Sequence, residues 1–157
     1  MSANTAFLAP IGSILSWSDG TPRPPERHRK KLSAWKTNNS SGRLIRKQDE
    51  RASGNITVPA TVTFHEADFG GSGVIAVRVY RTFSLDSDLT FTITQCPTVG
   101  SYRVFDRPGD AADLVHLAAN RQAAEEWLSR HGYPRAVLEE VTADEIAADF
   151  VEGRAVA

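Results

Sequence analysis

The pattern of hydrophobic and polar residues changes twice along the chain. Up to about residue 42, apolar residues are sparse and are interrupted by proline and glycine, which predicts an irregular extension. Between residues 43 and 105, apolar and polar residues alternate and β-branched residues are common, as is typical of strands. From residue 106 onward, apolar residues recur at helical spacing. The pattern therefore predicts an α+β fold, in which a small, mainly antiparallel sheet of about four or five strands within 43–105 is covered by C-terminal helices.

The middle part contains several short strand candidates separated by turn residues. Phe91 and Ile93 share one face and threonines the other, as expected for a half-buried strand. Pro59 cannot donate a hydrogen bond to a neighbouring strand, so we expect an edge strand or a break there. Short strands with close turns favour antiparallel pairing. The candidates are 43–46 (as an edge strand), 56–58, 61–64, 74–80, 90–94 and 101–105.

Helices are predicted on both sides of these strands. A short helix is expected at 25–36, because a proline suits its first position. A final helix is expected from about Thr142 to near Gly153, where a capping-box pattern follows a strand predicted at 136–141. A longer helix is expected after Asp110, its predicted N-cap, because five later residues fall at helical spacing: Leu114, Leu117, Arg121, Ala124 and Leu128.

Charge is separated along the chain. The 157 residues carry a net charge of −1, with 18 basic and 19 acidic residues. Residues 21–51 nonetheless hold ten basic and three acidic residues, a local charge of +7, whereas residues 106–157 hold five basic and eleven acidic residues, a local charge of −6. We therefore expect two units, a basic extension at 1–42 and a single α+β domain at 43–157. Such asymmetry indicates an arm that binds a polyanion or an acidic surface.

The basic segment is the main candidate binding site. Phosphate groups need cations at short spacing, and counterion release supplies most of the affinity. Trp35 lies among these cations and could stack on a base or pack into a partner. We therefore predict a non-catalytic binding module whose partner is nucleic acid or an acidic protein surface. The predicted partner-binding residues are Arg27, Arg29, Lys30, Lys31, Trp35, Lys36, Arg43, Arg46 and Lys47.

Two alternatives remain open at this stage. The basic segment could pack against the acidic C-terminal helices of its own chain. The protein could also be an interaction or inhibitor protein that acts through apolar contacts, with Trp17, Trp35 and Trp127 as exposed candidates. A weaker nucleic-acid surface is predicted on the strands, where arginines and aromatic residues could hold phosphates and stack bases: Arg78, Tyr80, Arg81, Tyr102 and Arg103.

Few residues indicate catalysis. His65, Asp68 and Cys96 could form a small hydrolase site, since a cysteine and a histidine need only be close in space. No second histidine follows Glu66 at the spacing of a zinc protease, and no lysine follows the glycines of 70–73 as in a phosphate-binding loop. The hydrolase is kept as a lesser alternative, and we expect no catalytic residue, no metal site and no cofactor.

Cysteine usage and hydropathy predict a cytoplasmic protein that does not contact membranes. Cys96 is the single cysteine, as is common in a reducing compartment. The apolar stretch at 6–15 has no basic residue before it and contains Pro10 and Gly12, unlike an export signal. No window approaches the roughly 18 apolar residues of a membrane span. The sequence leaves the oligomeric state open.

Overall fold

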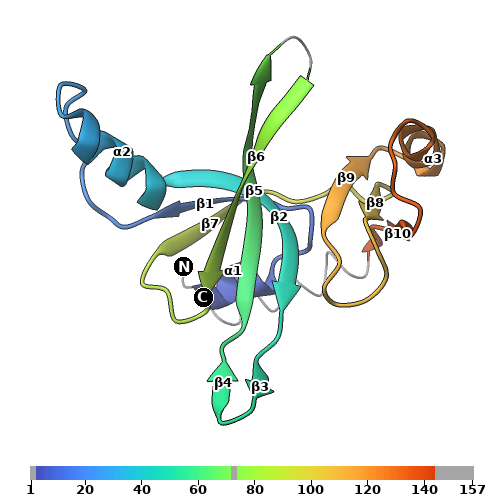
Figure 1. The fold of residues 1–157 in the computed structure, drawn as a ribbon, viewed down its shortest axis with the longest axis horizontal. Helices are drawn as coiled ribbons and strands as arrows, with labels where there is room; N and C mark the ends of the chain where they lie inside the picture. Colours follow the sequence, from blue (N-terminus) through green and yellow to red (C-terminus); the bar gives the residue numbers. More distant parts are fainter. Residues whose placement is uncertain (1–2, 72–73, 144–157) are drawn as a thin grey trace.

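The computed structural model describes residues 3–71 and 74–143, which form three helices and ten strands (Figure 1). In chain order the elements are α1 (Ala3–Leu8), β1 (Ile14–Ser18), α2 (Arg29–Asn38), β2 (Ser40–Gln48), β3 (Arg51–Ser53), β4 (Ile56–Val58), β5 (Thr61–Gly71), β6 (Val74–Ser84), β7 (Thr90–Gln95), β8 (Tyr102–Phe105), β9 (Leu114–Ala118), α3 (Arg121–Arg130) and β10 (Val137–Glu140).

The strands of the described part pair antiparallel and form three sheets. The largest has five strands in the order β6-β5-β2-β1-β7. A three-stranded sheet, β10-β8-β9, packs against α3, and these four elements, with the loops that join them, are named the C-terminal module. β3 and β4 form a separate hairpin. α2 and α3 lie at opposite ends of the long axis of the molecule (Figure 1).

The protein is mostly β, so the prediction of an α+β fold with a sheet covered by C-terminal helices is wrong. Within the described residues, α3 is the one helix of this region, and it packs on the three-stranded sheet of its own module through Ala124, Trp127 and Leu128. The apolar face of the five-stranded sheet is covered instead by α1 and the residue after it, which contribute Ala6 and Ala9.

The N-terminal residues expected to be irregular include a strand in the interior of the five-stranded sheet. β1 lies between β2 and β7, with Leu15 and Trp17 buried and their neighbours only half-buried. The alternation spans only five residues and follows Pro10 and Gly12, which obscured it in the sequence. The segment 43–46, expected at an edge, belongs to the middle strand β2.

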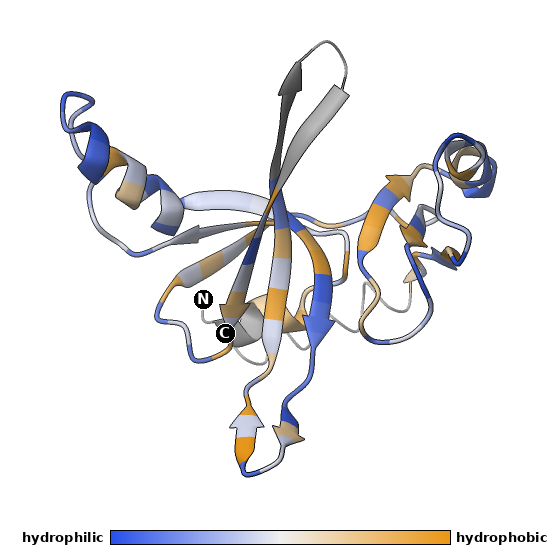
Figure 2. Cartoon of the chain, in the orientation of Figure 1, coloured by the Kyte–Doolittle hydropathy of each residue, from blue (hydrophilic) through white to orange (hydrophobic). Residues whose placement is uncertain are grey.

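The other predicted strands are confirmed. The candidates 56–58, 61–64, 74–80, 90–94 and 101–105 lie in β4, β5, β6, β7 and β8, and the strand predicted at 136–141 is β10. Pro59 falls between β4 and β5, so the expected break is present. Figure 2 shows orange hydrophobic residues along the strands of both large sheets, whereas α2 is mainly hydrophilic.

The helix predicted from Leu114 to Leu128 is a strand followed by a helix. β9 takes the first five residues, and α3 begins at Arg121. The N-cap is Asn120 and not Asp110, because the Asn120 side-chain oxygen accepts a hydrogen bond of 2.8 Å from the backbone N–H of Ala123. Two leucines three residues apart fit a helix, but here they lie on a strand that pairs with β8.

The two remaining helix predictions have different outcomes. The helix expected at 25–36 is confirmed as α2, which starts later because residues 25–28 form a turn with a hydrogen bond from the His28 N–H to the Pro25 carbonyl. The helix expected from about Thr142 to near Gly153 lies outside the described residues from 144 onward. No helix in residues 3–71 or 74–143 combines the length and the apolar surface that a bilayer crossing requires.

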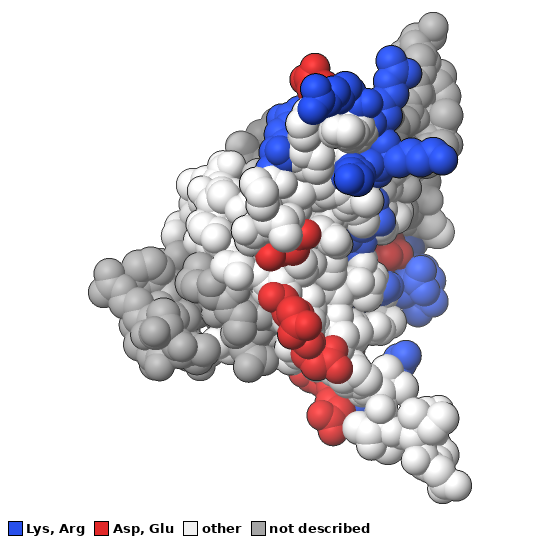
Figure 3. Space-filling model, turned by 90° about the vertical axis from the view of Figure 1, so that its left-hand side faces the viewer, with Lys and Arg blue, Asp and Glu red and all other residues white. Residues whose placement is uncertain are grey.

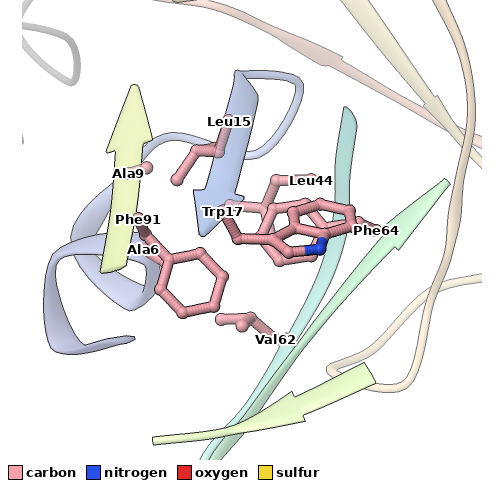
Figure 4. Close-up of a cluster of buried hydrophobic side chains, with 8 residues drawn as sticks. All are labelled: Ala6, Ala9, Leu15, Trp17, Leu44, Val62, Phe64 and Phe91. Atoms are coloured by element: carbon pink, nitrogen blue, oxygen red, sulfur yellow. The ribbon is translucent and has the colours of Figure 1, made fainter. Parts of the chain in front are cut away.

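An aromatic cluster forms the centre of the main core (Figure 4). Trp17, Phe64, Phe83 and Phe91 bring their ring centroids within 5.1–6.5 Å of one another. The rings come from β1, β5, β6 and β7, so they join strands that are far apart in the sequence. Leu15, Leu44 and Val62 complete the buried layer beneath α1.

A β-bulge in β2 connects the five-stranded sheet to the C-terminal module. Leu44 is paired with Phe64, but the next paired residue is Arg46, so Ile45 is the extra residue. Leu44 packs in the main core, whereas Ile45 packs with Phe105, Ala112 and Leu114 of the C-terminal part. Arg46 and Asp113 form an ion pair of 3.0 Å across the same junction. The bulge therefore places two consecutive residues of β2, Leu44 and Ile45, in two different hydrophobic cores.

Candidate functional site

The predicted basic cluster lies on α2 and on the loop before it. Arg29, Lys30 and Lys31 form the first helical turn, which contains no acidic residue. Arg27 precedes them, Lys36 lies in the last turn, and all five side chains are exposed. Figure 3 shows the basic side chains gathered at this end of the molecule. The structure thus brings five of the eight predicted cations onto one arm.

The arm is attached to the sheet mainly by hydrogen bonds. The indole N–H of Trp17 donates to the Thr37 carbonyl at 3.2 Å, so the core tryptophan also holds the end of α2. Just beyond the helix, the side-chain oxygen of Asn39 accepts from the Ser18 hydroxyl at 2.7 Å. Leu32 is the one buried residue of α2. The arm therefore presents its polar surface to solvent.

Trp35 belongs to the same arm but serves its structure. Its indole N–H donates to the Thr21 carbonyl at 3.0 Å, which holds the loop before α2 against the helix. The side chain is half-buried. Trp35 is therefore placed with the cations as predicted, while its polar edge is used within the protein.

Asp19 fixes the start of this loop. Its carboxylate accepts hydrogen bonds from the Thr21 hydroxyl at 2.6 Å, from the Thr21 N–H at 2.9 Å and from the Asn39 amide at 3.1 Å. These bonds favour the charged form, those from Thr21 most, so the pKa of Asp19 lies below its ordinary value of 3.8. The stabilisation is complete above that value and is lost as the pH falls through the lower pKa of the folded protein.

We expect the amide resonance of Thr21 to titrate with a midpoint below 3.8, the ordinary pKa of aspartate, because its N–H bonds to the Asp19 carboxylate. A pH series of amide NMR spectra measures this midpoint. In Asp19→Asn the Thr21 titration should disappear, since no carboxylate remains beside it. A midpoint at or above the ordinary aspartate value would contradict the hydrogen-bonded arrangement.

The cations of the arm have no carboxylate partners in the part of the chain that the structure describes. The nearest ion pair on this loop joins Arg23 to Glu26 at 3.9 Å, with both side chains exposed. The Arg27 side chain donates to the His28 ring at 3.3 Å. Pairing of the arm with acidic residues of the C-terminal part is therefore not seen among residues 3–71 and 74–143.

The three predicted binding residues of β2 do not join the arm, and each has a partner inside the protein. Arg43 is half-buried and donates from Nη1 to the Gly12 carbonyl at 2.7 Å. Arg46 pairs with Asp113, as described above. The Lys47 ammonium lies 5.9 Å from the ring centroid of Phe7. Since β2 is the middle strand of the sheet, these three cations contact neighbouring elements of the fold and do not extend the basic arm.

The weaker predicted surface on the strands is also divided. Arg103 is buried, with 1% of its surface exposed. Tyr102 packs in the core of the C-terminal module. Arg81 forms an ion pair of 2.8 Å with Glu66, whereas Tyr80 is exposed. The side chain of Arg78 lies outside the described residues.

The residues of the hydrolase alternative are spread across the sheet. Cys96 is exposed and directly follows Gln95. Across the sheet, Gln95 pairs with Ile14, Ile14 pairs with Arg43, and Arg43 pairs with His65. Three strand steps of about 4.8 Å separate the two ends of this row, roughly 14 Å along the sheet. A nucleophile and its base need hydrogen-bond contact. The side chain of Asp68 lies outside the described residues, and the register does not favour a Cys96–His65 pair.

The structure reveals a cleft that the sequence pattern did not indicate. It lies between β5 and β6 of the large sheet and the C-terminal module, with a volume of about 390 Å³. Its walls include His65 and Tyr80 from the sheet and His116, Trp127 and Tyr133 from the module. These residues come from four separate parts of the sequence, so only the three-dimensional fold brings them together.

Stacked rings form the module side of this cleft. The Trp127 ring lies 4.6 Å from the ring of His116 at an interplanar angle of 1°, and 3.9 Å from that of His131 at 12°. Tyr133 lies 5.6 Å from Trp127 at 14°. His131 also approaches the Trp127 carbonyl with Nδ1 at 2.7 Å. The spacing of Trp127 and His131, one helical turn apart, was the one sequence signal for part of this stack.

Histidines and carboxylates of the cleft do not form a metal site. No group of three histidine, cysteine or carboxylate side chains among the described residues has the geometry to hold a metal ion. The arrangement instead offers aromatic faces and hydrogen-bonding edges.

The fold and these two surfaces define a mostly β protein with a basic helical arm at one end and an aromatic cleft toward the other. Residues 1–145 match a family described as "Uncharacterised conserved protein UCP036055", and the chain belongs to this family. No curated protein and no solved structure matches the chain.

Proposed function

We propose that the protein is a non-catalytic binding module that docks nucleic acid through its phosphate backbone, using the basic arm formed by α2 and the loop before it. The observation that carries this proposal is the exposure of Arg27, Arg29, Lys30, Lys31 and Lys36 without carboxylate partners among the described residues. Their charges are therefore available to an external anion.

The position of these cations increases their attraction for anions. Three of them occupy the first turn of α2, where the free backbone N–H groups and the helix dipole already create positive potential. An acidic residue at this end would stabilise the helix, but Arg29, Lys30 and Lys31 stand there instead. The three cations therefore make the start of α2 less stable, but they concentrate positive charge at this end of the arm.

Of the two partner classes left open by the sequence, nucleic acid is better supported than an acidic protein. Protein interfaces normally contain an apolar or aromatic centre surrounded by polar residues. On α2, Leu32 is buried and Trp35 is half-buried and bonded to Thr21. What remains exposed is cationic and polar, which suits phosphate groups and counterion release.

The interaction hypothesis based on exposed tryptophans receives less support. Trp17 is 2% exposed and lies in the main core, while Trp127 is half-buried within the ring stack. The most exposed large apolar residue among those described, Ile56, lies on the β3–β4 hairpin. We also propose a cytoplasmic location, which the single, unpaired Cys96 supports.

The test is a salt series of binding to mixed-sequence single- and double-stranded DNA and RNA. We expect affinity to fall steeply with salt in the parent protein. In the triple variant Arg29→Ala, Lys30→Ala and Lys31→Ala, the slope of log affinity against log salt should decrease by about one for each lost phosphate contact. Affinity at low salt should fall by at least about tenfold.

A matched control removes the same charge from the C-terminal module through Arg121→Ala, Arg130→Ala and Arg135→Ala, all at exposed positions. This control should keep the parent slope. Equal losses in both variants would show a net-charge effect and overturn the role of the arm. Absence of nucleic-acid binding, with binding of poly-glutamate that the α2 variant loses, would instead identify an acidic protein as the partner.

A further inference from the structure

The cleft beside the C-terminal module is separate from the basic arm and carries an inference of its own. We propose that it binds a small planar organic anion, whose charged group lies at Arg43, His65 and His116 and whose ring lies between Tyr80 and Tyr133. The cleft volume of about 390 Å³ is within the range of small-molecule sites, about 300–1,000 Å³.

The two sides of the cleft are set by the register of the large sheet. Arg43 and His65 are paired across β2 and β5, and they alternate with the buried Leu44 and Phe64. They therefore lie on the face opposite the main core, toward the C-terminal module. A hollow of about 240 Å³ lined by Arg43, His65 and His116 adjoins the larger cleft, with which it shares His65 and His116.

Arg43 is a half-buried cation whose charge is not balanced within the described part of the chain. One of its five N–H donors bonds to the Gly12 carbonyl, and no described carboxylate pairs with it. Burial lowers the pKa of Arg43, because the charged form has lost part of its hydration. A carboxylate or phosphate group in the hollow would supply both the missing countercharge and acceptors for the free N–H groups.

The carboxylates that border the cleft are engaged elsewhere. Asp113 pairs with Arg46, and burial still raises the pKa of Asp113. Asp106 pairs with Arg107 at 3.1 Å and accepts a hydrogen bond from the Asp113 N–H at 2.9 Å. These contacts leave the Arg43 end of the cleft positive, which favours an anion over a cation.

The pKa of His116 depends on the same local charge, that of Arg43. Its pKa is lowered by burial, and further by the positive charges of His131 and Arg43. An anion bound at Arg43 would oppose those charges and stabilise the protonated imidazole. Binding should therefore raise the pKa of His116, and this shift gives a readout that is independent of affinity.

The aromatic residues account for the planar part of the ligand. The rings of His116, Trp127, His131 and Tyr133 lie within 14° of parallel in each contact with Trp127. Flat rings stack in such layers, with polar groups kept at their edges. On the opposite wall, Tyr80 is 49% exposed and lies 5.6 Å from His65, so its ring can cover a planar ligand without moving the core.

The experiment is an NMR titration of the full chain with four probes: benzoate, phenyl phosphate, neutral benzamide and inorganic phosphate. We expect benzoate or phenyl phosphate to shift the signals of Arg43, His116 and Tyr133 and to raise the pKa of His116. The comparison of these two probes distinguishes a carboxylate from a phosphate ligand. Benzamide, which has the ring without the charge, should bind at least about tenfold more weakly.

Variants separate the charge from the ring. Arg43→Gln removes the charge but keeps a polar side chain, and it should weaken binding of the anionic ring by about tenfold or more. Tyr80→Ala lies at an exposed position, so it should fold normally and weaken benzoate more than inorganic phosphate. Arg121→Gln on the outer side of α3, with 69% of its side chain exposed, is the matched control and should bind like the parent.

Several results would overturn the proposal. Benzamide binding as tightly as benzoate would show an apolar cleft without anion selectivity. Inorganic phosphate binding as tightly as phenyl phosphate would remove the planar part of the proposal. Unchanged spectra with all four probes at tens of millimolar, or equal affinity of the parent and Arg43→Gln, would remove the site altogether.

Discussion

Replacing Phe64 with alanine should lower the free energy of unfolding by about 3–5 kcal/mol. The Phe64 side chain is fully buried, and its ring lies 5.2–6.1 Å from the rings of Trp17, Phe83 and Phe91. Truncation removes apolar burial and leaves a cavity that three large rings cannot readily fill. The loss should be large because this ring stands at the centre of the cluster that joins β1, β5, β6 and β7.

Urea denaturation followed by tryptophan fluorescence measures this effect, since Trp17 lies in the same cluster. Ile56→Ala serves as the control, because Ile56 is 70% exposed and its truncation should change stability by no more than about 0.5 kcal/mol. A loss below about 1 kcal/mol for Phe64→Ala would mean that the aromatic cluster is not the main core.

Arg103→Ala should be the second large loss, about 3 kcal/mol. The Arg103 side chain is 1% exposed, and its Nε donates to the Ile11 carbonyl at 2.6 Å. Its Nη1 contacts Glu139 at 3.1 Å. Arg103 therefore joins the loop before β1 to β8 and β10. Truncation would leave a cavity and would take the arginine donor from the Ile11 carbonyl.

Two further variants divide this loss into its parts. Arg103→Met fills most of the space without the hydrogen bonds, so it should cost less than the alanine variant, about 1–2 kcal/mol. Glu139→Gln should cost no more than about 1 kcal/mol, since the Glu139 side chain is 56% exposed and solvent screens the pair. Denaturant unfolding of the three proteins under one set of conditions tests the order, and equal losses for methionine and glutamine would contradict it.

Local alternation predicted most of the sheet. Phe91 lies inward as expected, and Pro59 separates two strands as expected. The failures have physical causes. The strand around Trp17 is too short to show periodicity beside Pro10 and Gly12. The apolar residues of 114–118 match both a strand and a helix, and pairing with β8 decides between them.

The sequence predicted the cationic cluster of α2, whose residues are close together in the chain. It did not predict the cleft, whose residues are brought together only by tertiary structure. Arg29, Lys30 and Lys31 are adjacent in the sequence, so their exposure on one helix turn could be expected. Arg43 was grouped with them by charge alone, but its alternation with the buried Leu44 along β2 turns it toward the hollow beside the cleft. The association of His116 with His65 arises from the packing of two sheets, which no local pattern encodes.

The bulge at Ile45 also bears on which changes in length this chain can tolerate. Loss of one residue between Arg43 and Lys47 would restore a regular ladder with β5. It would also leave one position where Ile45 and Arg46 now both contact the C-terminal part, because side chains alternate along a regular strand. Either Ile45 would leave the contact with Phe105 and Leu114, or Arg46 would leave Asp113. Insertions and deletions should therefore be tolerated less in β2 than conservative substitutions. The number of residues in this strand decides which side chains contact the main core and which contact the C-terminal part.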